Sequence, residues 1–472
     1  MTSLHPIGER LRALLNDPAW ADTVAGAVVG VAVGDEEVVV AHGSANLNTN
    51  QPFTEDTGFL LGSVTKVLVT TALMRLVERG QVDLDAPAKR YVPEFTLSDK
   101  DAAERITVRM LVNHTNGIDC DALCPWSVRG RDASRSYTEY LPKIGVLFEP
   151  GACVHYSNPG FVLAARVIEE QIGLPFERAI QSELLDPAGL RDATAVQTQA
   201  FLRRTAVGAY ADLETKKLRA SSVFTLGEGL AGGGTTMIVS PQDMLAFGRM
   251  HLRGGVAPNG SRVLAEELVT AMRATNFDLG IPQAPPVGLG WWAFPIAGTT
   301  AYHHAGGSPG GTSSFCIIPE YDAVIISFVT GPGKGPLNDA LHMAAIEEVT
   351  GRSLTPPLKL EPQPIPESIG GEYRSFQLCA NLEVKGDELV VTNTYEPYDQ
   401  EHRDFFKEMF SPAAYPPVTY HSVSPGQFGP AGLEPLAYAG FLRRSNLLAT
   451  LPAAANRRMG LHTGLRYIPK VS

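Results

Sequence analysis

The residues with the clearest chemical potential lie at the start of an expected helix. Ser63 and Lys66 are three residues apart in Gly62-Ser63-Val64-Thr65-Lys66. That spacing puts both side chains on one helical face, so the lysine can reach the serine hydroxyl. A serine becomes a good nucleophile when a nearby base takes its proton. A lysine acts as that base when burial or a second cation lowers its pKa. A serine N-cap beside a solvated lysine is the structural alternative.

Two later segments carry further candidate residues. Tyr156-Ser157-Asn158 precedes an expected helix, and His304-Ala305-Gly306-Gly307 precedes two apolar strands. A tyrosine in a loop can shuttle protons, and an amide can hydrogen-bond a substrate. A glycine pair at a strand edge leaves room for a ligand to approach the backbone. Taken singly, each segment also fits a helix entry or a glycine bend.

In combination and in this order, the three segments resemble the serine β-lactamase and penicillin-binding-protein superfamily. The resemblance is greatest to its class C β-lactamase-like branch, which includes esterases, D-aminopeptidases and penicillin-binding-protein-type thioesterases. It covers roughly residues 5 to 350. The supporting text is Phe59–Lys66, Gly80–Asp85, Leu111–Gly117, Pro150-Gly151, Tyr156-Ser157-Asn158, Ala231–Gly234 and His303–Gly307.

The resemblance implies a role for each candidate residue. Ser63 would be acylated, Lys66 would be its base, and Tyr156 would pass protons. Asn158 would steady Lys66 and the substrate amide. The N–H groups of Ser63 and Gly307 would form the oxyanion hole beside Gly306, and His304 would occupy the third-motif position. These members usually hold the site between an α+β domain and a helical one.

His304 departs from the β-lactamase pattern, which usually has lysine at this position. A histidine is mostly neutral at pH 7 and offers one donor and one acceptor. We therefore expect substrates that need no free carboxylate, and slight penicillin turnover. We also expect activity to fall below about pH 6, as His304 and Lys66 take up protons.

The periodicity predicts the elements that must position these residues. A β-hairpin is expected over 27–33 and 36–41, turning at Gly34-Asp35. Helices are expected over 64–79, 161–172, 241–253 and about 337–349, and strands over 313–318 and 323–329. Strands at both ends with helices between predict one α+β domain, in which an antiparallel sheet flanked by helices adjoins a helical subdomain.

The composition changes after this domain. Residues 353–368 read SLTPPLKLEPQPIPES, a stiff proline-rich linker. Short alternating runs follow and predict a small all-β domain. The expected division is therefore 1–352 catalytic, 353–368 linker and 369–472 β-rich, with the last part shaping one side of the substrate entrance.

Composition narrows the function further. A net charge of -11 argues against a nucleic-acid partner. No signal peptide or membrane-length apolar run is visible, so a cytoplasmic protein without membrane association is expected. Cys120 and Cys124 are spaced for a metal, but two ligands do not close a site. No metal or cofactor is expected.

Three functions remain in competition. The first is a serine acyl hydrolase that forms an acyl-enzyme with a small-molecule or peptidyl ester, amide or peptide. The second is acyl transfer or peptide cyclisation of the penicillin-binding-protein-type thioesterase kind, with a thioester or carrier-protein-bound donor. The third is a non-catalytic scaffold. Water and an amine compete for the acyl-enzyme in the first two, and labelling of the serine separates both from the third.

Overall fold

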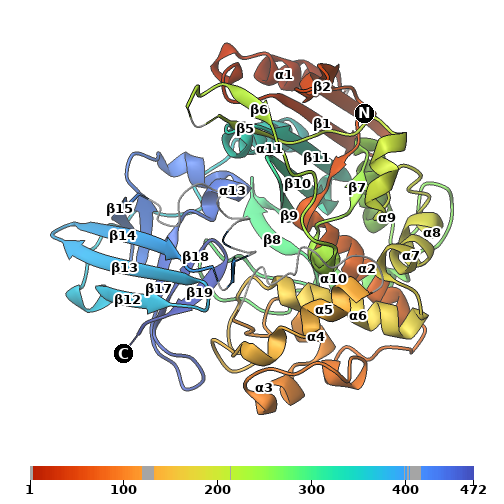
Figure 1. Cartoon of the computed structure of the whole chain (residues 1–472). Helices are drawn as coiled ribbons and strands as arrows, with labels where there is room; N and C mark the ends of the chain where they lie inside the picture. The colour runs from red at the N-terminus through yellow and green to blue at the C-terminus, as the bar shows by residue number, and fades with distance from the viewer. Residues whose placement is uncertain are drawn as a thin grey trace.

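A computed structural model describes residues 4–119, 132–212, 214–397, 399–400, 403 and 416–471. Figure 1 shows a helix-rich body joined to a smaller β domain that contains the C-terminus. Cys120 and Cys124, the pair considered for a metal, lie outside the described residues. Within the described residues, no helix is both long and apolar enough to cross a membrane.

The body is organised around a seven-stranded antiparallel sheet in the order β3-β2-β1-β11-β10-β9-β8. Gly26 on β1 pairs with Thr330 on β11, so the two ends of this part of the chain meet in the sheet centre. The predicted hairpin and the predicted strand pair are therefore confirmed within one sheet. The strands are β1 (Gly26–Val33), β2 (Glu36–Asn46), β3 (Gln51–Pro52), β8 (Trp292–Ile296), β9 (Thr299–Ser308), β10 (Gly311–Ile318) and β11 (Ala323–Thr330).

Both faces of the sheet are covered by helices. Alternate residues of β1 enter different cores: Val28 packs towards α2 and α9, whereas Val29 packs towards α1 and α11. Burial on both faces explains why β1 is an almost uninterrupted apolar run. The predicted helices are confirmed as α2 (Thr65–Glu78), α6 (Asn158–Ile172), α9 (Pro241–Leu252) and α11 (Lys334–Thr350), and a further helix, α1 (His5–Leu15), precedes the sheet.

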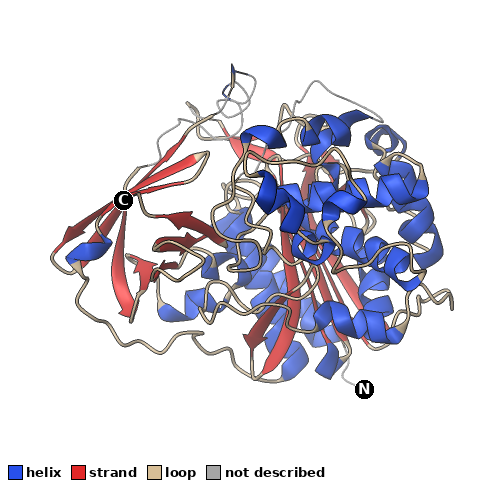
Figure 2. Ribbon diagram, turned by 90° about the horizontal axis from the view of Figure 1, so that it is seen from below, coloured by secondary structure: helices blue, strands red, loops and turns tan. Residues whose placement is uncertain are grey.

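A helical subdomain lies beside the sheet, as Figure 2 shows in a second view. Its core joins α2 to α4 and α6 through residues such as Leu68, Leu111 and Phe161. The remaining short elements are α3 (Lys100–Arg105), α4 (Val108–Val112), α5 (Ala133–Thr138), α7 (Phe176–Ile180), α8 (Asp186–Ala188), α10 (Glu266–Arg273), β4 (Phe59–Leu60), β5 (Ala209–Ala211), β6 (Leu218–Ala220) and β7 (Ile238–Val239).

The C-terminal domain is an eight-stranded antiparallel sheet in sequential order. A bridge between Tyr373 and Lys470 joins its first and last strands, so the sheet nearly closes into a barrel. The predicted α+β fold with a C-terminal all-β domain is confirmed. The elements are β12 (Gly371–Arg374), β13 (Leu378–Lys385), β14 (Glu388–Tyr395), β15 (Val418–Ser424), β16 (Gln427–Pro430), α13 (Phe441–Arg444), β17 (Leu448–Leu451), β18 (Gly460–Thr463) and β19 (Arg466–Pro469).

The barrel is docked onto the body by polar contacts. The buried Asp339 carboxylate on α11 accepts hydrogen bonds from the N–H groups of Leu442 and Arg443, both at 2.9 Å. Between the two parts, residues 353–366 form no helix or strand. The expected domain limits of 1–352, 353–368 and 369–472 stay a prediction.

Candidate active site

Ser63 lies in a short helical turn, Gly62–Val64, directly before α2. Gly62 has φ +61°, and a Cβ there would come within 2.6 Å of the Gly307 carbonyl oxygen. A Cβ on Gly306 or Gly234 would approach the Ser63 backbone nitrogen to 3.0 or 2.9 Å. Glycine is required at these positions because the turn that carries Ser63 is packed directly against neighbouring backbone.

Lys66 lies one turn further along α2 and is completely buried. Its Nζ donates a hydrogen bond to the Gly233 carbonyl at 2.5 Å. The same Nζ lies 4.9 Å from the centre of the Tyr156 ring and 5.5 Å from that of Phe161. The lysine is therefore held inside the protein beside the expected proton carrier, which excludes the solvated-lysine alternative.

Tyr156 and Asn158 enter the site from the segment before α6. The Tyr156 ring stacks on His114 with a centroid distance of 4.7 Å. Asn158 is the first residue of α6, and a Cβ on Gly233 would lie 3.4 Å from its Oδ1. Asn158 thus lies beside the carbonyl that binds Lys66. Ser157 caps α6, since its Oγ accepts the Gly160 N–H at 3.1 Å.

His114 lies in a turn beside the Tyr156 segment. It has φ +62°, and its Nδ1 accepts the Ser157 N–H at 3.0 Å. Its pKa lies well below the usual value, because burial penalises the charged ring. His114 therefore supports the Tyr156 segment as a neutral acceptor.

His304 lies on β9, and its side chain is buried. Its Nδ1 contacts the Ala305 carbonyl oxygen at 2.7 Å, and since that oxygen only accepts, Nδ1 carries the proton. The Nε2 atom is buried and has no hydrogen-bond partner among the described residues. A neutral His304 can therefore only accept from a substrate, because its donor is already used.

The expected loss of activity through His304 protonation near pH 6 is wrong. Burial, reinforced by the charge of Lys66, lowers the pKa of His304 to about 3. His304 consequently stays neutral throughout the working range of an ordinary enzyme. The neighbouring His303 has its Nε2 2.7 Å from Ser314 Oγ and contributes, like His304, to the lining of the cavity above Ser63.

A cavity of about 270 Å³ opens above Ser63. Its catalytic-domain lining includes Tyr156, His304, Gly306 and Gly307, so the structure brings these predicted residues together around the serine. The other wall comes from the C-terminal domain. That wall comprises Phe441, Leu442, Ser445, Gly464, Leu465 and Arg466. The C-terminal domain thus forms one wall of the cavity above Ser63, and its role in shaping the substrate entrance stays a prediction.

No sequence pattern pointed to Arg466. It lies about three hundred residues after Tyr156 and belongs to no recognisable motif. Its guanidinium lies 5.1 Å from the centre of the Tyr156 ring and also donates to the Gly464 carbonyl at 3.3 Å. The site therefore contains a permanent cation that the departure at His304 had not led us to expect.

Trp291 and Trp292 were expected to be core or pocket wall. Trp291 is core and Trp292 lines the cavity. Tyr210, a weaker candidate for the pocket, is not part of the lining. It lies instead near Arg219 and Lys334, whose charged groups are 5.7 and 5.8 Å from its ring.

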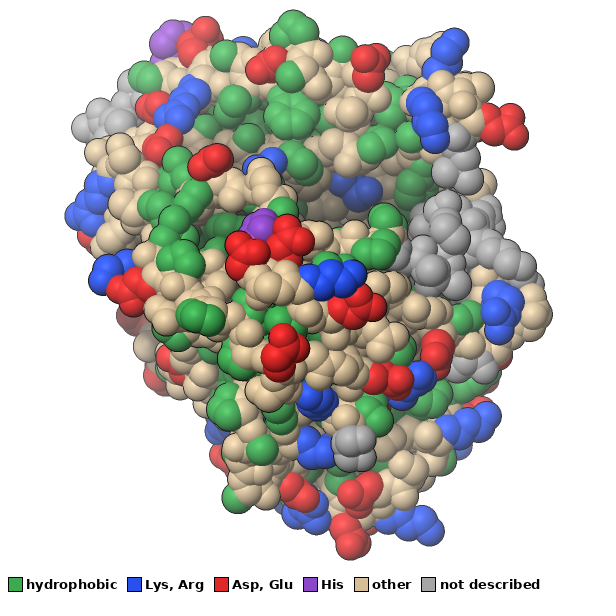
Figure 3. All heavy atoms as spheres, turned by 90° about the vertical axis from the view of Figure 1, so that its left-hand side faces the viewer, with side chains coloured by type: hydrophobic (Ala, Val, Ile, Leu, Met, Phe, Trp, Pro, Cys, Tyr) green, Lys and Arg blue, Asp and Glu red, His purple; other side chains and the backbone are tan. Residues whose placement is uncertain are grey.

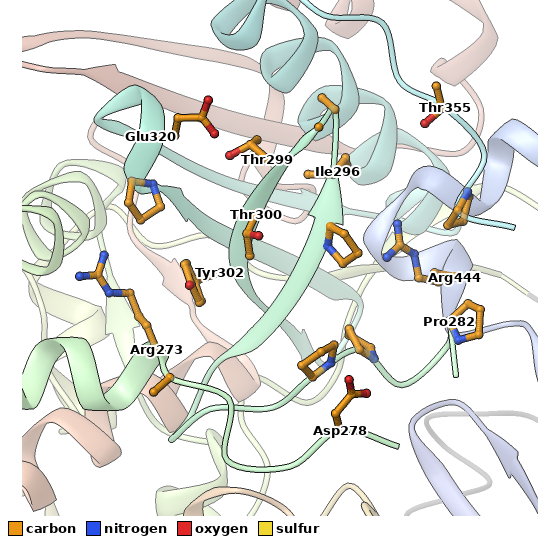
Figure 4. A pocket seen from close by; sticks show the side chains of 18 of the residues that line it. Arg273, Asp278, Pro282, Ile296, Thr299, Thr300, Tyr302, Glu320, Thr355 and Arg444 are labelled. Atoms are coloured by element: carbon orange, nitrogen blue, oxygen red, sulfur yellow. The ribbon is translucent and has the colours of Figure 1, made fainter. Parts of the chain in front are cut away.

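A larger cavity of about 1170 Å³ runs along the edge strand β8 and is shown in Figure 4. The cavity is lined by Arg273, Tyr302, Glu320 and Arg444, among others, and it shares no lining residue with the cavity above Ser63.

On the barrel side of the molecule, Figure 3 shows acidic and basic side chains interspersed. That face does not present the basic patch expected of a nucleic-acid site.

Comparison with known proteins places this site in a family. Residues 11–349 match the Beta-lactamase family. Penicillin-binding protein 4 of Amycolatopsis lactamdurans is 29% identical over 66% of this chain and 81% of its own length. Esterase EstB of Burkholderia gladioli is 31% identical over 41% of this chain and 53% of its own length.

Solved structures share the fold. SurE aligns over 99% of this chain and 100% of its own, with TM-score 0.74 and 21% identity. A D-amino acid amidase of Ochrobactrum anthropi SV3 aligns over 73% of this chain and 98% of its own, with TM-score 0.60 and 23% identity. With the family match covering most of the sequence, the chain belongs to the β-lactamase family of serine hydrolases.

Proposed function

We propose that this protein is a serine acyl hydrolase that forms a covalent acyl-enzyme at Ser63. Its substrate is an ester, an amide or a peptide that needs no free carboxylate. The observation that carries the proposal is the burial of Lys66, which follows the serine by one helical turn and whose Nζ lies beside Tyr156. A lysine that reacts as the neutral amine, with a tyrosine beside it, can take the proton that a serine nucleophile must lose.

The proposed reaction has two halves. Ser63 Oγ attacks the substrate carbonyl while its proton passes to the Lys66 and Tyr156 pair. The N–H groups of Ser63 and Gly307 stabilise the oxyanion. The bond to the leaving alcohol or amine then breaks, and the leaving group takes the proton. In the second half, water attacks the Ser63 ester and gives up a proton to the same pair. The bond between the acyl carbon and Ser63 Oγ then breaks, the pair returns the proton to Oγ, and the acid leaves.

The cavity favours a substrate that has an apolar acyl group and a hydrogen-bond donor close to it. Trp292, Phe294, Phe441 and Leu465 supply apolar walls, while His304 Nε2 can accept a substrate N–H or O–H. The D-amino acid amidase that shares the fold was crystallised with L-phenylalanine amide and with D-phenylalanine. We therefore propose amides and esters of apolar amino acids as the first substrates to examine.

A second function is favoured by the barrel wall. Phe441, Leu442 and Leu465 shield one side of the Ser63 cavity from water, and such shielding lets an amine compete for the acyl-enzyme. SurE, also crystallised with D-Leu, matches the whole chain, barrel included. Acyl transfer or cyclisation from a thioester donor is therefore the second proposal.

One experiment separates the two proposals. Purified protein is given an ester, an amide and a peptidyl thioester of one peptide, with and without an added D-amino-acid amine, and products are identified by mass. Free acid in every reaction supports hydrolysis. Amide or cyclic product as the major species supports transfer. Absence of turnover with every donor would reject both.

A further inference from the structure

The C-terminal barrel touches the backbone of the proposed proton carrier. Tyr156 donates its own N–H to the carbonyl of Leu465, at 2.9 Å, in the turn between β18 and β19. The edge of the barrel that carries this turn faces the catalytic domain (Figure 1). The Arg466 guanidinium over the Tyr156 ring belongs to the same hairpin. The barrel therefore contacts both the main chain and the ring of Tyr156.

The residues before Tyr156 are tied to the same hairpin. The Tyr467 N–H donates to His155 Nδ1 at 3.1 Å. His462 Nε2 lies 3.2 Å from the Val154 carbonyl oxygen, and because a carbonyl only accepts, the histidine donates. Val154, His155 and Tyr156 form no helix or strand of their own. The backbone groups of Val154 and Tyr156 thus depend on the barrel for hydrogen bonds that secondary structure would otherwise supply, and the His155 side chain adds a third bond between the two parts.

On its other side, the segment is tied to the catalytic domain. The His155 N–H donates to the His114 carbonyl at 2.9 Å, and the Ser157 N–H donates to His114 Nδ1 at 3.0 Å. The bonds alternate, so that the Tyr156 N–H turns towards the barrel while its two neighbours turn towards His114. Removing the barrel would leave the Tyr156 N–H without its partner.

The hairpin turn is shaped for this contact. Gly464 and Leu465 have φ values of +55° and +66°, as a tight two-residue hairpin turn requires. A left-handed leucine is uncommon, and the contacts of this turn account for it. The Gly464 N–H is in turn held by the Ser445 carbonyl, at 3.0 Å. The conformation of the turn is therefore held by a hydrogen bond within the barrel itself.

We propose that the β18–β19 hairpin is a positioning element for Tyr156, and that His155 is the residue through which the barrel holds it. The proposal rests on the proposed function, in which Tyr156 moves protons. A displacement of about 1 Å in such a group costs on the order of 100-fold in rate. Burial lowers the pKa of His155 to about 3, so its acceptor nitrogen stays available at working pH.

The test compares two substitutions of His155. The Oδ1 of the His155→Asn side chain can replace Nδ1 as the acceptor, whereas His155→Leu has no acceptor. His421→Leu, at an exposed histidine on β15, is the matched control. Two readouts are used: the rate of Ser63 acylation by an activated ester, and hydrogen exchange of the peptide that contains Tyr156.

We expect His155→Leu to slow acylation by about 10- to 100-fold and to raise exchange at Tyr156 by at least about tenfold. His155→Asn should return both to within about threefold of wild type, and His421→Leu should change neither. Unchanged exchange in His155→Leu would overturn the proposal. Faster exchange with an unchanged acylation rate would overturn it as well.

A second pair of variants tests the proposal in case His155→Leu does not fold. Leu465→Asn suits the left-handed turn, whereas the branched side chain of Leu465→Val opposes it and displaces the carbonyl. Because Leu465 also lines the cavity, this pair is compared by hydrogen exchange alone: only Leu465→Val should raise exchange at Tyr156, and equal exchange in the pair would contradict the proposal. Failure of wild type to acylate Ser63 would reject the proposed function instead, and exchange would still decide whether the barrel holds Tyr156.

Discussion

On acidification this protein should unfold at an unusually high pH, because many of its histidines are buried and neutral. Within the described residues, burial lowers the pKa of His114, His155, His251, His303, His304, His342 and His462. The pKa falls to about 3 for His155, His251, His304 and His342, and to about 4 for His462. In the unfolded chain these histidines take up protons near pH 6.5, whereas in the folded chain they stay neutral at that pH.

The magnitude follows from those values. Between pH 7 and pH 5, each of the five histidines with a stated pKa lowers the free energy of unfolding by about 2 kcal/mol. Asp119 and Asp339 act in the opposite direction, since burial raises the pKa of each to about 6. Each therefore returns about 1 kcal/mol over the same interval. The net loss is on the order of 7 to 8 kcal/mol, which is comparable to the whole stability of many domains.

Urea unfolding followed by circular dichroism at pH 7, 6 and 5 measures this loss. His251→Gln provides the perturbation, because His251 donates to Thr71 from Nε2, at 3.2 Å, and an amide can do the same. That variant should lose about 2 kcal/mol less than wild type between pH 7 and 5. His421→Gln, at an exposed site, should follow wild type. A wild-type unfolding free energy that changes by less than about 1 kcal/mol over this range would refute the reasoning.

Three further predictions concern the site and the barrel. Gly234→Ala should slow acylation by about 100-fold or more, because its Cβ would lie 2.2 Å from the Gly62 carbonyl oxygen. Gly80 also has a positive φ, but a Cβ there would meet open space, so Gly80→Ala should retain the wild-type rate in the same stopped-flow assay. A protease should cut the chain within residues 353–366. The two fragments should nevertheless co-elute on gel filtration, because Asp339 and Leu465 form hydrogen bonds across the interface between the catalytic domain and the barrel. A barrel that separates from the catalytic domain after cleavage would contradict this prediction. Wild type should hydrolyse substrates with a blocked C-terminus at least about tenfold faster than the same substrates with a free C-terminal carboxylate, and His304→Lys should shift that preference towards the free carboxylate by adding a permanent cation. Faster hydrolysis of the free-carboxylate substrates by wild type, lost in Arg466→Gln, would show that the barrel arginine serves as the carboxylate anchor instead.

The elements and the motif residues could be predicted because their signals are local. Ser63 and Lys66 share one helical turn. The end-to-end closure of the sheet followed from the two runs of apolar strands at either end of the domain. The order of the three motifs then indicated the family.

The barrel side of the cavity could not be predicted in the same way. Phe441 and Arg466 reach Ser63 only through tertiary docking, and no spacing rule connects them to Tyr156. The protonation of His304 was misjudged for a related reason. Its pKa depends on burial and on the charge of Lys66, neither of which is visible in the letters around it.

The central claim is that Ser63 carries the acyl group. Intact-mass spectrometry after mixing with an activated ester of an apolar amino acid measures this directly, with peptide mapping to locate the added mass. We predict one added acyl group on Ser63 in wild type, none in a folded Ser63→Ala variant, and slow formation in Lys66→Met. Turnover by Ser63→Ala at close to the wild-type rate, or an acyl group mapped to another residue, would contradict the account.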